Sequence, residues 1–241
     1  MPLESTAQHV FTSRQPELPV ESGRAPIDPW ITAARSVGAP PDRVMRVKQV
    51  HGRGVRVLLC GRVTTTDAND RPVGDAIVSN EPGLALSVSV ADCVPILIAD
   101  ARSGAAAAVH AGWRGTCARV APAAIDTMQR ECGTHPADCV VAIGPSIGPE
   151  DYAVGNELVE EYFAAGHAGS DVDRWFRRSD AKLTLDLWSA NRDHLTAGVQ
   201  PGRIFTCGLS TLARRDVFES FRGDGKRAGR MAGMVVVPLG Q

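Results

Sequence analysis

The alternation of apolar and polar positions predicts strands along much of the chain. The segment 43–59 alternates β-branched and polar residues and is broken by a glycine-rich stretch at 52–54. Short, nearly continuous apolar runs follow, which is the pattern of buried strands. These further strands are predicted at 75–80, 84–90, 94–100, 105–110, 139–145, 202–208 and 231–239.

Apolar residues at helical spacing alternate with these strands. They predict helices at 30–38, 116–132, 155–165 and 186–197. Residues 1–29 show no clear periodicity and are expected to be irregular, and 222–230 is expected to be a basic loop. With no repeat and no linker, the pattern favours a single mixed α/β (α+β) domain over residues 30–241.

Composition narrows the class of protein. The 241 residues are 44% hydrophobic and 22% charged, with a net charge of −1, so neither nucleic acid nor an anionic membrane is an expected partner. No apolar stretch has the length of a signal sequence core or a membrane span. We therefore expect a cytoplasmic protein, a monomer or small homo-oligomer, that acts on a small molecule. Six scattered cysteines are expected to be reduced thiols.

Three reactive side chains stand where predicted strands end. His51 follows a β-like run, Cys93 interrupts two apolar strands, and His110 precedes the glycine turn of "VHAGWRG" at 109–115. Two imidazoles and a thiolate can form a three-ligand Zn²⁺ site with one position left for substrate. The spacing matches no short zinc motif, so a Cys–His nucleophile pair remains open.

Charged residues near these positions add candidates for binding and proton transfer. Asp92 is a charge within a buried strand pair, and Arg114 beside His110 is a candidate anion contact. Arginines at 222, 227 and 230 crowd a glycine-rich loop that is equally suited to a solvated turn and to an anion contact. Trp113 is expected to pack beneath the helix rather than to stack on a ligand.

Several blocks, in order, resemble the laccase-domain family, also called multicopper polyphenol oxidoreductases or purine nucleoside phosphorylases. They are KQVHG (48–52), DAIVSNEPGLALSVSVADCVPILIAD (75–100), AAVHAGWRG (107–115), AIGPSIGPEDYAVG (142–155), LDLWSAN (185–191) and the C-terminal FESFRGDGKRAGRMAG segment. The likeness runs from about residue 40 to the C-terminus. Within it, Phe221 replaces the family's tyrosine and Gly223 a second arginine.

The resemblance implies both a fold and an activity. The fold would be stacked mixed sheets flanked by helices, similar to cysteine-hydrolase-like deamidase toxins. Zinc would be bound by His51, Cys93 and His110. The activity would be phosphorolysis of adenosine, inosine, guanosine and methylthioadenosine, with adenosine deamination in some members.

Copper oxidation is not expected, despite the family's older name. Six histidines without a His-x-His pair cannot assemble a four-copper site. In the phosphorylase hypothesis, phosphate and substrate would be bound by Arg114, Lys48, Gln49 and Arg222. Asp75 or Asp92 would move protons if the enzyme deaminates adenosine.

Two alternatives remain open. One is a cysteine hydrolase or amidase in which Cys93 is the nucleophile and His110 the base. The other is a metal-binding or scaffold protein without enzymatic activity.

Overall fold

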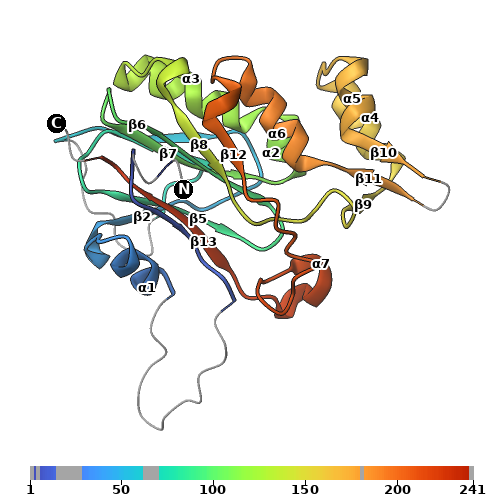
Figure 1. The fold of residues 1–241 in the computed structure, drawn as a ribbon, viewed down its shortest axis with the longest axis horizontal. Coiled ribbons are helices and arrows are strands. Elements are labelled where there is room, and N and C mark those ends of the chain that lie inside the picture. The colour runs from blue at the N-terminus through green and yellow to red at the C-terminus, as the bar shows by residue number, and fades with distance from the viewer. Residues whose placement is uncertain (1–2, 4–5, 15–28, 62–70, 180–181, 239–241) are drawn as a thin grey trace, which may run out of the picture.

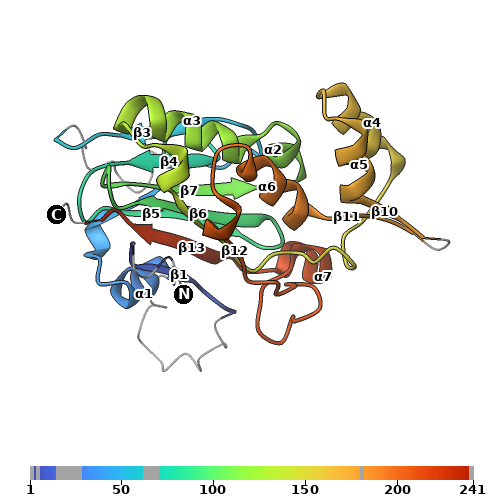
Figure 2. The ribbon, with the colours of Figure 1, turned by 45° about the horizontal axis from the view of Figure 1, so that its top comes forward.

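The computed structural model describes residue 3 and residues 6–14, 29–61, 71–179 and 182–238. Two β-sheets lie face to face, and helices cover both outer surfaces (Figures 1 and 2). The expectation of one α/β domain with stacked mixed sheets is confirmed. None of the helices in the described ranges has the length and apolarity needed to cross a bilayer.

The larger sheet has six strands and mixed direction. Outer pairs β12/β8 and β3/β4 are parallel, whereas the central strands run antiparallel. In spatial order the strands are β12 (Ile204–Thr206), β8 (Val140–Ile143), β6 (Val94–Asp100), β7 (Ala105–Ala111), β4 (Ala76–Ser79) and β3 (Val55–Leu58).

The smaller sheet packs on one face of the larger one. Its strands in spatial order are β1 (His9–Phe11), β13 (Met231–Val236), β5 (Ala85–Val90) and β2 (Val44–Arg46). Side chains such as Leu86, Val88 and Leu97 form the core between the sheets. This stacking brings the ends of strands from both sheets to one side of the molecule.

Helices cover the remaining faces. The helix α1 packs on β13, whereas α2, α3 and α6 cover the far face of the six-stranded sheet. The helices α4 and α5 join a three-stranded sheet that projects to one side. The bounds are α1 (Pro29–Ser36), α2 (Trp113–Cys117), α3 (Val120–Cys132), α4 (Asn156–Ala164), α5 (Gly169–Trp175), α6 (Leu187–Thr196), α7 (Phe221–Asp224), β9 (Ala153–Val154), β10 (Phe176–Arg178) and β11 (Leu183–Leu185).

The strand β7 is unusually poor in large side chains. All seven of its residues are buried, and residues 105–108 are alanines. Ala106 and Ala108 face the smaller sheet, while Ala107 and Val109 face the helices. Small side chains on both faces let the two layers approach β7 closely.

The structure corrects the sequence analysis at three places. A strand, β1, lies within 1–29, where irregular chain was expected; it pairs with β13 with His9 opposite Val235. The helix expected at 116–132 is two helices, because Arg119 has a left-handed backbone (φ 60°) and its guanidinium binds the carbonyls of residues 165 and 166. The short helix α7 occupies part of the expected loop at 222–230. The boundary between 29 and 30 remains a prediction.

Candidate metal centre and active site

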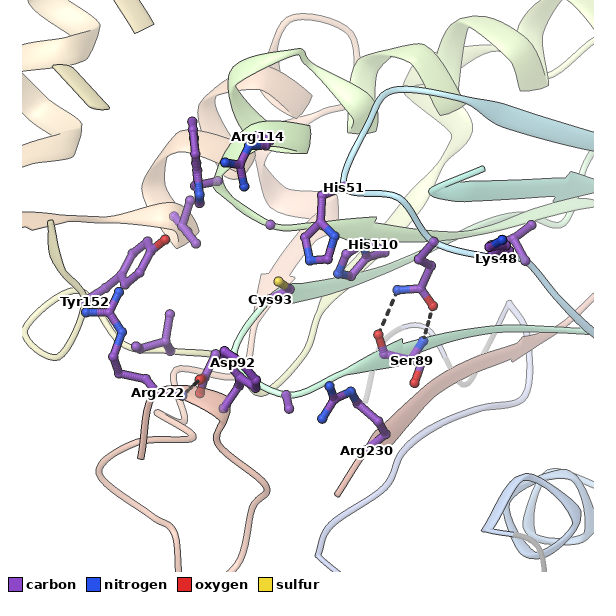
Figure 3. A pocket seen from close by; sticks show the side chains of 18 of the residues that line it. Lys48, His51, Ser89, Asp92, Cys93, His110, Arg114, Tyr152, Arg222 and Arg230 are labelled. Atoms are coloured by element: carbon purple, nitrogen blue, oxygen red, sulfur yellow. Dashed lines mark hydrogen bonds between the residues drawn. The ribbon is translucent and has the colours of Figure 1, made fainter. Parts of the chain in front are cut away.

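A cavity of about 680 Å³ opens where the ends of the two sheets meet. The loop after β2, the turn before β6, the end of β7 and the helix α7 all contribute to its wall. Its lining combines a Cys/His cluster, several arginines and the aromatic side chains of Trp113, Tyr152 and Phe221 (Figure 3). The size is that of a pocket for a small molecule.

The cavity brings together the three side chains that the sequence singled out. His51, Cys93 and His110 each offer a ligand atom, and these atoms all lie within 4.8 Å of one another. The two imidazole rings meet edge to face with centroids 4.9 Å apart. Among the described residues this is the one such group of metal-ligating side chains. Two nitrogens and a sulfur suit zinc, and three protein ligands leave a coordination position open.

Two residues of the loops that carry the cluster have an unusual backbone conformation. His51 has φ 61°, and Asp92, directly before Cys93, has φ 87°. Both values lie in the left-handed region, which non-glycine residues rarely adopt and which costs of the order of 1 kcal/mol or more. Hydrogen bonds offset the strain: the backbone N–H of His51 donates to Asp75, and the carboxylate of Asp92 accepts from Thr211 and Arg222.

Asp75 holds one side of the cluster. Its Oδ1 accepts from the backbone N–H of His51 at 2.9 Å, and its Oδ2 accepts from that of Gly52 at 2.7 Å. Asp75 Oδ1 also lies 2.9 Å from His110 Nδ1. That bond leaves Nε2 as the nitrogen of His110 that faces Cys93. A carboxylate on the far nitrogen of a histidine ligand fixes its ring and tautomer.

Asp75 was expected to move protons during deamination, but the structure places it where it cannot contact a substrate in the cavity. Its side chain is fully buried and does not line the cavity. Burial by itself raises the pKa of this carboxyl, but the hydrogen bonds from His110, Gly52 and His51 outweigh burial and lower it. Asp75 stays ionised and positions two of the candidate ligands.

Contacts with the two histidines make the thiol of Cys93 acidic. Burial alone raises its pKa, yet hydrogen bonds with His110 and His51, together with their charge, bring the pKa down to about 6. For His110, burial opposes the charged form, while Asp75 and Cys93 favour it and raise the pKa to about 9. A thiolate at neutral pH can act as a metal ligand or a nucleophile.

Gly112 explains part of the "VHAGWRG" turn. A Cβ at this position would lie 2.9 Å from Cys93 Sγ and 3.3 Å from His51 Cδ2. The first separation is shorter than real Cβ contacts allow. The backbone itself has φ −71° and ψ 176°, which any residue adopts. The glycine is required by the close approach of the cluster, not by conformational freedom.

Gly112→Ala is expected to lower zinc affinity roughly ten- to a hundredfold by displacing Cys93 and His51. Competition with a chromophoric chelator measures this affinity. Gly202→Ala is the control, since no atom lies within 4 Å of its added Cβ. Equal zinc affinity in both variants would show that the three ligands do not converge on one ion.

Asp92 lines the cavity, but both of its oxygens already accept hydrogen bonds. Thr211 Oγ1 donates to Oδ1 at 2.6 Å, and the backbone N–H of Arg222 donates to Oδ2 at 2.6 Å. Asp92 thereby ties the turn that carries Cys93 to the helix α7. A positioning role fits these contacts better than the expected proton transfer.

All four residues predicted to bind phosphate or substrate line the cavity, and they differ in the partners that they already have. The side-chain amide of Gln49 is already hydrogen-bonded, because it donates to and accepts from the backbone of Ser89 at 2.8 Å. Arg114 lies over the ring of Trp113 at 4.3 Å. Arg222 lies 5.0 Å from the ring centroid of Tyr152 and donates to the carbonyl of residue 153. Lys48 is exposed, with its side chain at the cavity.

Other lining residues were not singled out by sequence. Tyr152 sits within a glycine- and proline-rich loop, where nothing in the residue pattern separates a pocket tyrosine from a packing one. Burial is the main reason that its pKa rises to about 12. Arg46 and Arg71 also line the cavity, although they come from ordinary strand and loop sequence. Trp113 both packs against the core and lines the cavity.

Two other buried or half-buried histidines lie outside the cavity. His167 and His194 stack on each other 5.2 Å apart between α5 and α6, where His194 also meets Trp175. Burial is the first cause of a pKa of about 4 for His194. The structure gives His194 a packing role. Neither residue lines the cavity.

Comparison with known proteins identifies the family of this chain. The model of the multi-copper polyphenol oxidoreductase laccase family matches residues 30–238. The chain belongs to this family. Within the described residues, however, this family member offers a single Cys/His cluster rather than several copper sites.

Curated relatives have names from nucleoside chemistry. A Deinococcus radiodurans protein named purine nucleoside phosphorylase is 34% identical over 85% of this chain and 74% of its own length. A Bacteroides thetaiotaomicron protein with the same name is 39% identical over 68% of this chain and 60% of its own length. A protein from an unknown prokaryotic organism, named adenosine deaminase RL5, is 33% identical over 85% of this chain and 79% of its own length.

Solved structures share the fold. YlmD from Geobacillus stearothermophilus superposes with a TM-score of 0.77 at 29% identity, over 97% of this chain and 90% of that one. The Bacillus licheniformis hypothetical protein YfiH gives 0.78 at 26% identity, over 86% of this chain and 78% of that one. The stacked-sheet architecture of this laccase-family chain is therefore the family's own.

Proposed function

We propose that this laccase-family protein is a zinc-dependent purine nucleoside phosphorylase. The observation that carries the proposal is the His51–Cys93–His110 cluster in the wall of a cavity that is also lined by cationic and aromatic side chains. The names of the Deinococcus and Bacteroides relatives point to the same chemistry. A multi-copper oxidase would need more ligand clusters than the described residues contain.

The donor set supports zinc as the resident metal. The three ligands are a thiolate and two imidazoles, His110 is fixed by Asp75, and Gly112 leaves space for their approach. A zinc ion bound there would act as a Lewis acid toward an oxygen atom of a reactant. The remaining steps depend on the side chains around it.

Arg114 is the cation that we assign to inorganic phosphate. It follows Gly112 and Trp113 directly and lines the cavity beside the cluster. Its charge and planar donors would hold the phosphate while one phosphate oxygen bonds to C1′ of the ribose. The C1′–N bond breaks, its electron pair goes to the purine, and the base leaves after taking a proton from solvent. The products are the free base and ribose 1-phosphate.

The aromatic side chains of the cavity are suited to bind the purine. Trp113 and Tyr152 are half-buried and line the wall together with Arg114 and Leu187, and Arg114 lies over the ring of Trp113. Flat apolar surfaces of this kind bind a purine by stacking and exclusion of water. Phe221, half exposed at the rim, extends this apolar wall.

The proposal is tested by the phosphate dependence of base release. Purified protein is incubated with adenosine, inosine or methylthioadenosine with and without phosphate, and bases and ribose 1-phosphate are separated by chromatography. We expect base and ribose 1-phosphate in equal amounts, only with phosphate, and loss of both after zinc is chelated. Base release that continues without phosphate would contradict phosphorolysis.

Adenosine deamination is a second candidate, supported by the relative named adenosine deaminase RL5. In this reaction, oxygen from water bonds to C6 of the purine and ammonia leaves. The same chromatographic assay reports it as inosine that forms without phosphate. Asp92 is the cavity's carboxylate among the described residues, and its two hydrogen bonds leave it poorly placed to move the proton.

A cysteine hydrolase is the third candidate, because Asp75, His110 and Cys93 form a chain of orienting carboxylate, base and nucleophile. Alkylation by iodoacetamide separates it from a zinc enzyme. In metal-stripped protein, the alkylation rate of Cys93 is expected to rise with a midpoint near pH 6, because the pKa of the thiol is about 6. Zinc should block this alkylation. Active, zinc-free protein that alkylation inactivates would favour the hydrolase.

A further inference from the structure

The turn that carries Cys93 is not fixed by the strands on either side of it. The strand β5 ends at Val90 and β6 begins at Val94, so Asp92 and Cys93 lie outside both sets of strand hydrogen bonds. Asp92 also has a left-handed backbone, with φ 87°, which a residue other than glycine rarely adopts. The place of the Cys93 thiol therefore depends on the contacts that hold Asp92.

Three other segments hold Asp92, each through one hydrogen bond. The backbone N–H of Ile147 donates to the carbonyl of Asp92 at 2.9 Å. The backbone N–H of Arg222 donates to Oδ2, and the hydroxyl of Thr211 donates to Oδ1, both at 2.6 Å. Of these three donors, Thr211 alone uses its side chain. A substitution at Thr211 can therefore remove one contact and keep the two backbone contacts.

Thr211 is held in place by contacts that do not involve its hydroxyl. It is fully buried, and its backbone N–H donates to the carbonyl of Ser146 at 3.0 Å. Ser146 also forms a β-bridge with Ser210, and the indole of Trp188 donates to the Ser146 hydroxyl at 2.6 Å. Thr211 does not line the cavity, so it contacts neither a metal ion nor a substrate there. An effect of its hydroxyl on the cluster would pass through Asp92.

The carboxylate of Asp92 depends on this hydroxyl. Asp92 is 9% exposed and borders the cavity, whereas Thr211 is fully buried. Without the hydroxyl, Oδ1 would face a buried apolar group, and an unpartnered carboxylate oxygen is costly to bury. The carboxylate would rotate toward water in the cavity, and the backbone of Asp92 would lose a contact that offsets its strain. Cys93, the next residue, would move with it.

The two histidines of the cluster do not depend on this contact. Asp75 accepts a hydrogen bond from the backbone N–H of His51 and lies 2.9 Å from Nδ1 of His110. Two separate carboxylates therefore hold the cluster, Asp75 for the histidines and Asp92 for the cysteine.

We propose that Thr211 is a positioning residue for the candidate metal ligand Cys93 and acts through Asp92. This inference rests on the proposed function, because it takes zinc as the ion that the cluster binds. The contact places the thiolate within reach of the ion that His51 and His110 would bind, before that ion arrives. Outer contacts that orient metal ligands in this way typically change metal affinity by roughly ten- to a hundredfold.

Zinc affinity, measured by competition with a chromophoric chelator, tests this role. Thr211→Val keeps the shape of the side chain, removes the hydroxyl and should lower zinc affinity about tenfold. Thr211→Ser keeps the hydroxyl and should stay within about threefold of wild type. Thr127→Val is the matched control, because Thr127 is also buried and its hydroxyl donates to the carbonyl of residue 123 within α3, outside the cavity lining. Its zinc affinity should equal that of wild type.

Cobalt in place of zinc reports the bond to Cys93 directly. A thiolate bound to Co²⁺ gives a charge-transfer band in the near ultraviolet, which weakens when the sulfur moves away from the metal. We expect the band to weaken in Thr211→Val and to persist in Thr211→Ser. Urea unfolding of the metal-stripped variants is measured alongside, because a purely structural role of Thr211 would lower the free energy of unfolding and leave the band unchanged.

A double-mutant cycle tests whether Thr211 acts through Asp92. In Asp92→Gly, glycine adopts φ 87° without strain and has no carboxylate to be held. Thr211→Val should therefore change zinc affinity by less than about twofold when it is added to Asp92→Gly. An equal loss in the wild-type and Asp92→Gly backgrounds would mean that Thr211 acts by another route, and the inference would be wrong.

The outcomes also separate this inference from the proposed function. Equal zinc affinity of wild type and Thr211→Val, in protein that carries out zinc- and phosphate-dependent base release, overturns the role of Thr211 alone. Wild-type protein that binds no zinc overturns both. A loss of affinity in Thr211→Val that is absent in Thr211→Ser and in the Asp92→Gly background supports the role of Thr211, whether or not the protein releases base.

Discussion

Cys93→Ala is expected to lower phosphorolysis about a thousandfold and to reduce bound zinc from one ion per chain to nearly none. The thiolate is one of three ligands, and its removal leaves His51 and His110 to hold the ion alone. A factor of a thousand corresponds to about 4 kcal/mol, the size of the stabilisation that a Lewis acid gives to a transition state. Zinc content is measured by atomic spectroscopy and activity by base release.

Two variants make this result specific. Cys132→Ala removes a half-buried cysteine from the end of α3, outside the cavity lining, and should retain zinc and activity. Cys93→Asp keeps an anionic ligand and should retain more zinc than Cys93→Ala, although it has no nucleophilic sulfur. If Cys93→Asp binds zinc fully and is as inactive as Cys93→Ala, the cysteine acts as a nucleophile and the zinc hypothesis fails for the chemical step.

Asp75→Ala is expected to destabilise the fold by about 4 kcal/mol. The substitution leaves the backbone N–H groups of Val50, His51 and Gly52 and the Nδ1 of His110 without their acceptor. Loss of one partner of a buried charged pair costs about 3–5 kcal/mol. For a chain of this size, the melting temperature should fall by roughly 10 °C. Urea unfolding of metal-stripped protein measures the change directly.

The pH dependence of this loss has a definite sign. The folded-state pKa of Asp75 is lowered, so its contribution to stability is present above the ordinary value of about 4 and is lost as the pH falls through the folded value. The difference between wild type and Asp75→Ala should thus be steady between about pH 6 and 8 and shrink in acid. Asp126→Ala, at an exposed position on α3, is the control. A loss below about 1 kcal/mol at neutral pH would contradict the role given to Asp75.

The sequence predicted the elements well where the hydrophobic pattern was long and regular. The strands β5, β6 and β7 and the helices α4 and α6 begin and end within one residue of expectation. The break at Arg119 was not predictable, because it depends on hydrogen bonds to carbonyls some 46 residues away in sequence. The strand β1 was missed for a similar reason, since three residues become a strand only beside β13.

The candidate metal ligands were predictable in part. Each of His51, Cys93 and His110 ends or interrupts a predicted strand, a position that chemistry-bearing residues often take. Their convergence, however, follows from the stacking of two sheets, which periodicity does not specify. The roles of Asp75 and Asp92 could not be predicted either. The sequence does not distinguish a catalytic carboxylate from a buried one that accepts hydrogen bonds, such as Asp75 with its four donors.

The alanine run of β7 has a consequence for the order in which the protein folds. Alanine favours helices and is depleted in strands, so residues 105–108 have little tendency to become extended by themselves. We expect β7 to form only once β4 and β6 are present on either side of it. His110 lies on this strand and so reaches Cys93 late, which means that the nascent chain offers a metal only isolated ligands. Under the proposed function, we therefore expect zinc to be bound only after the domain has folded.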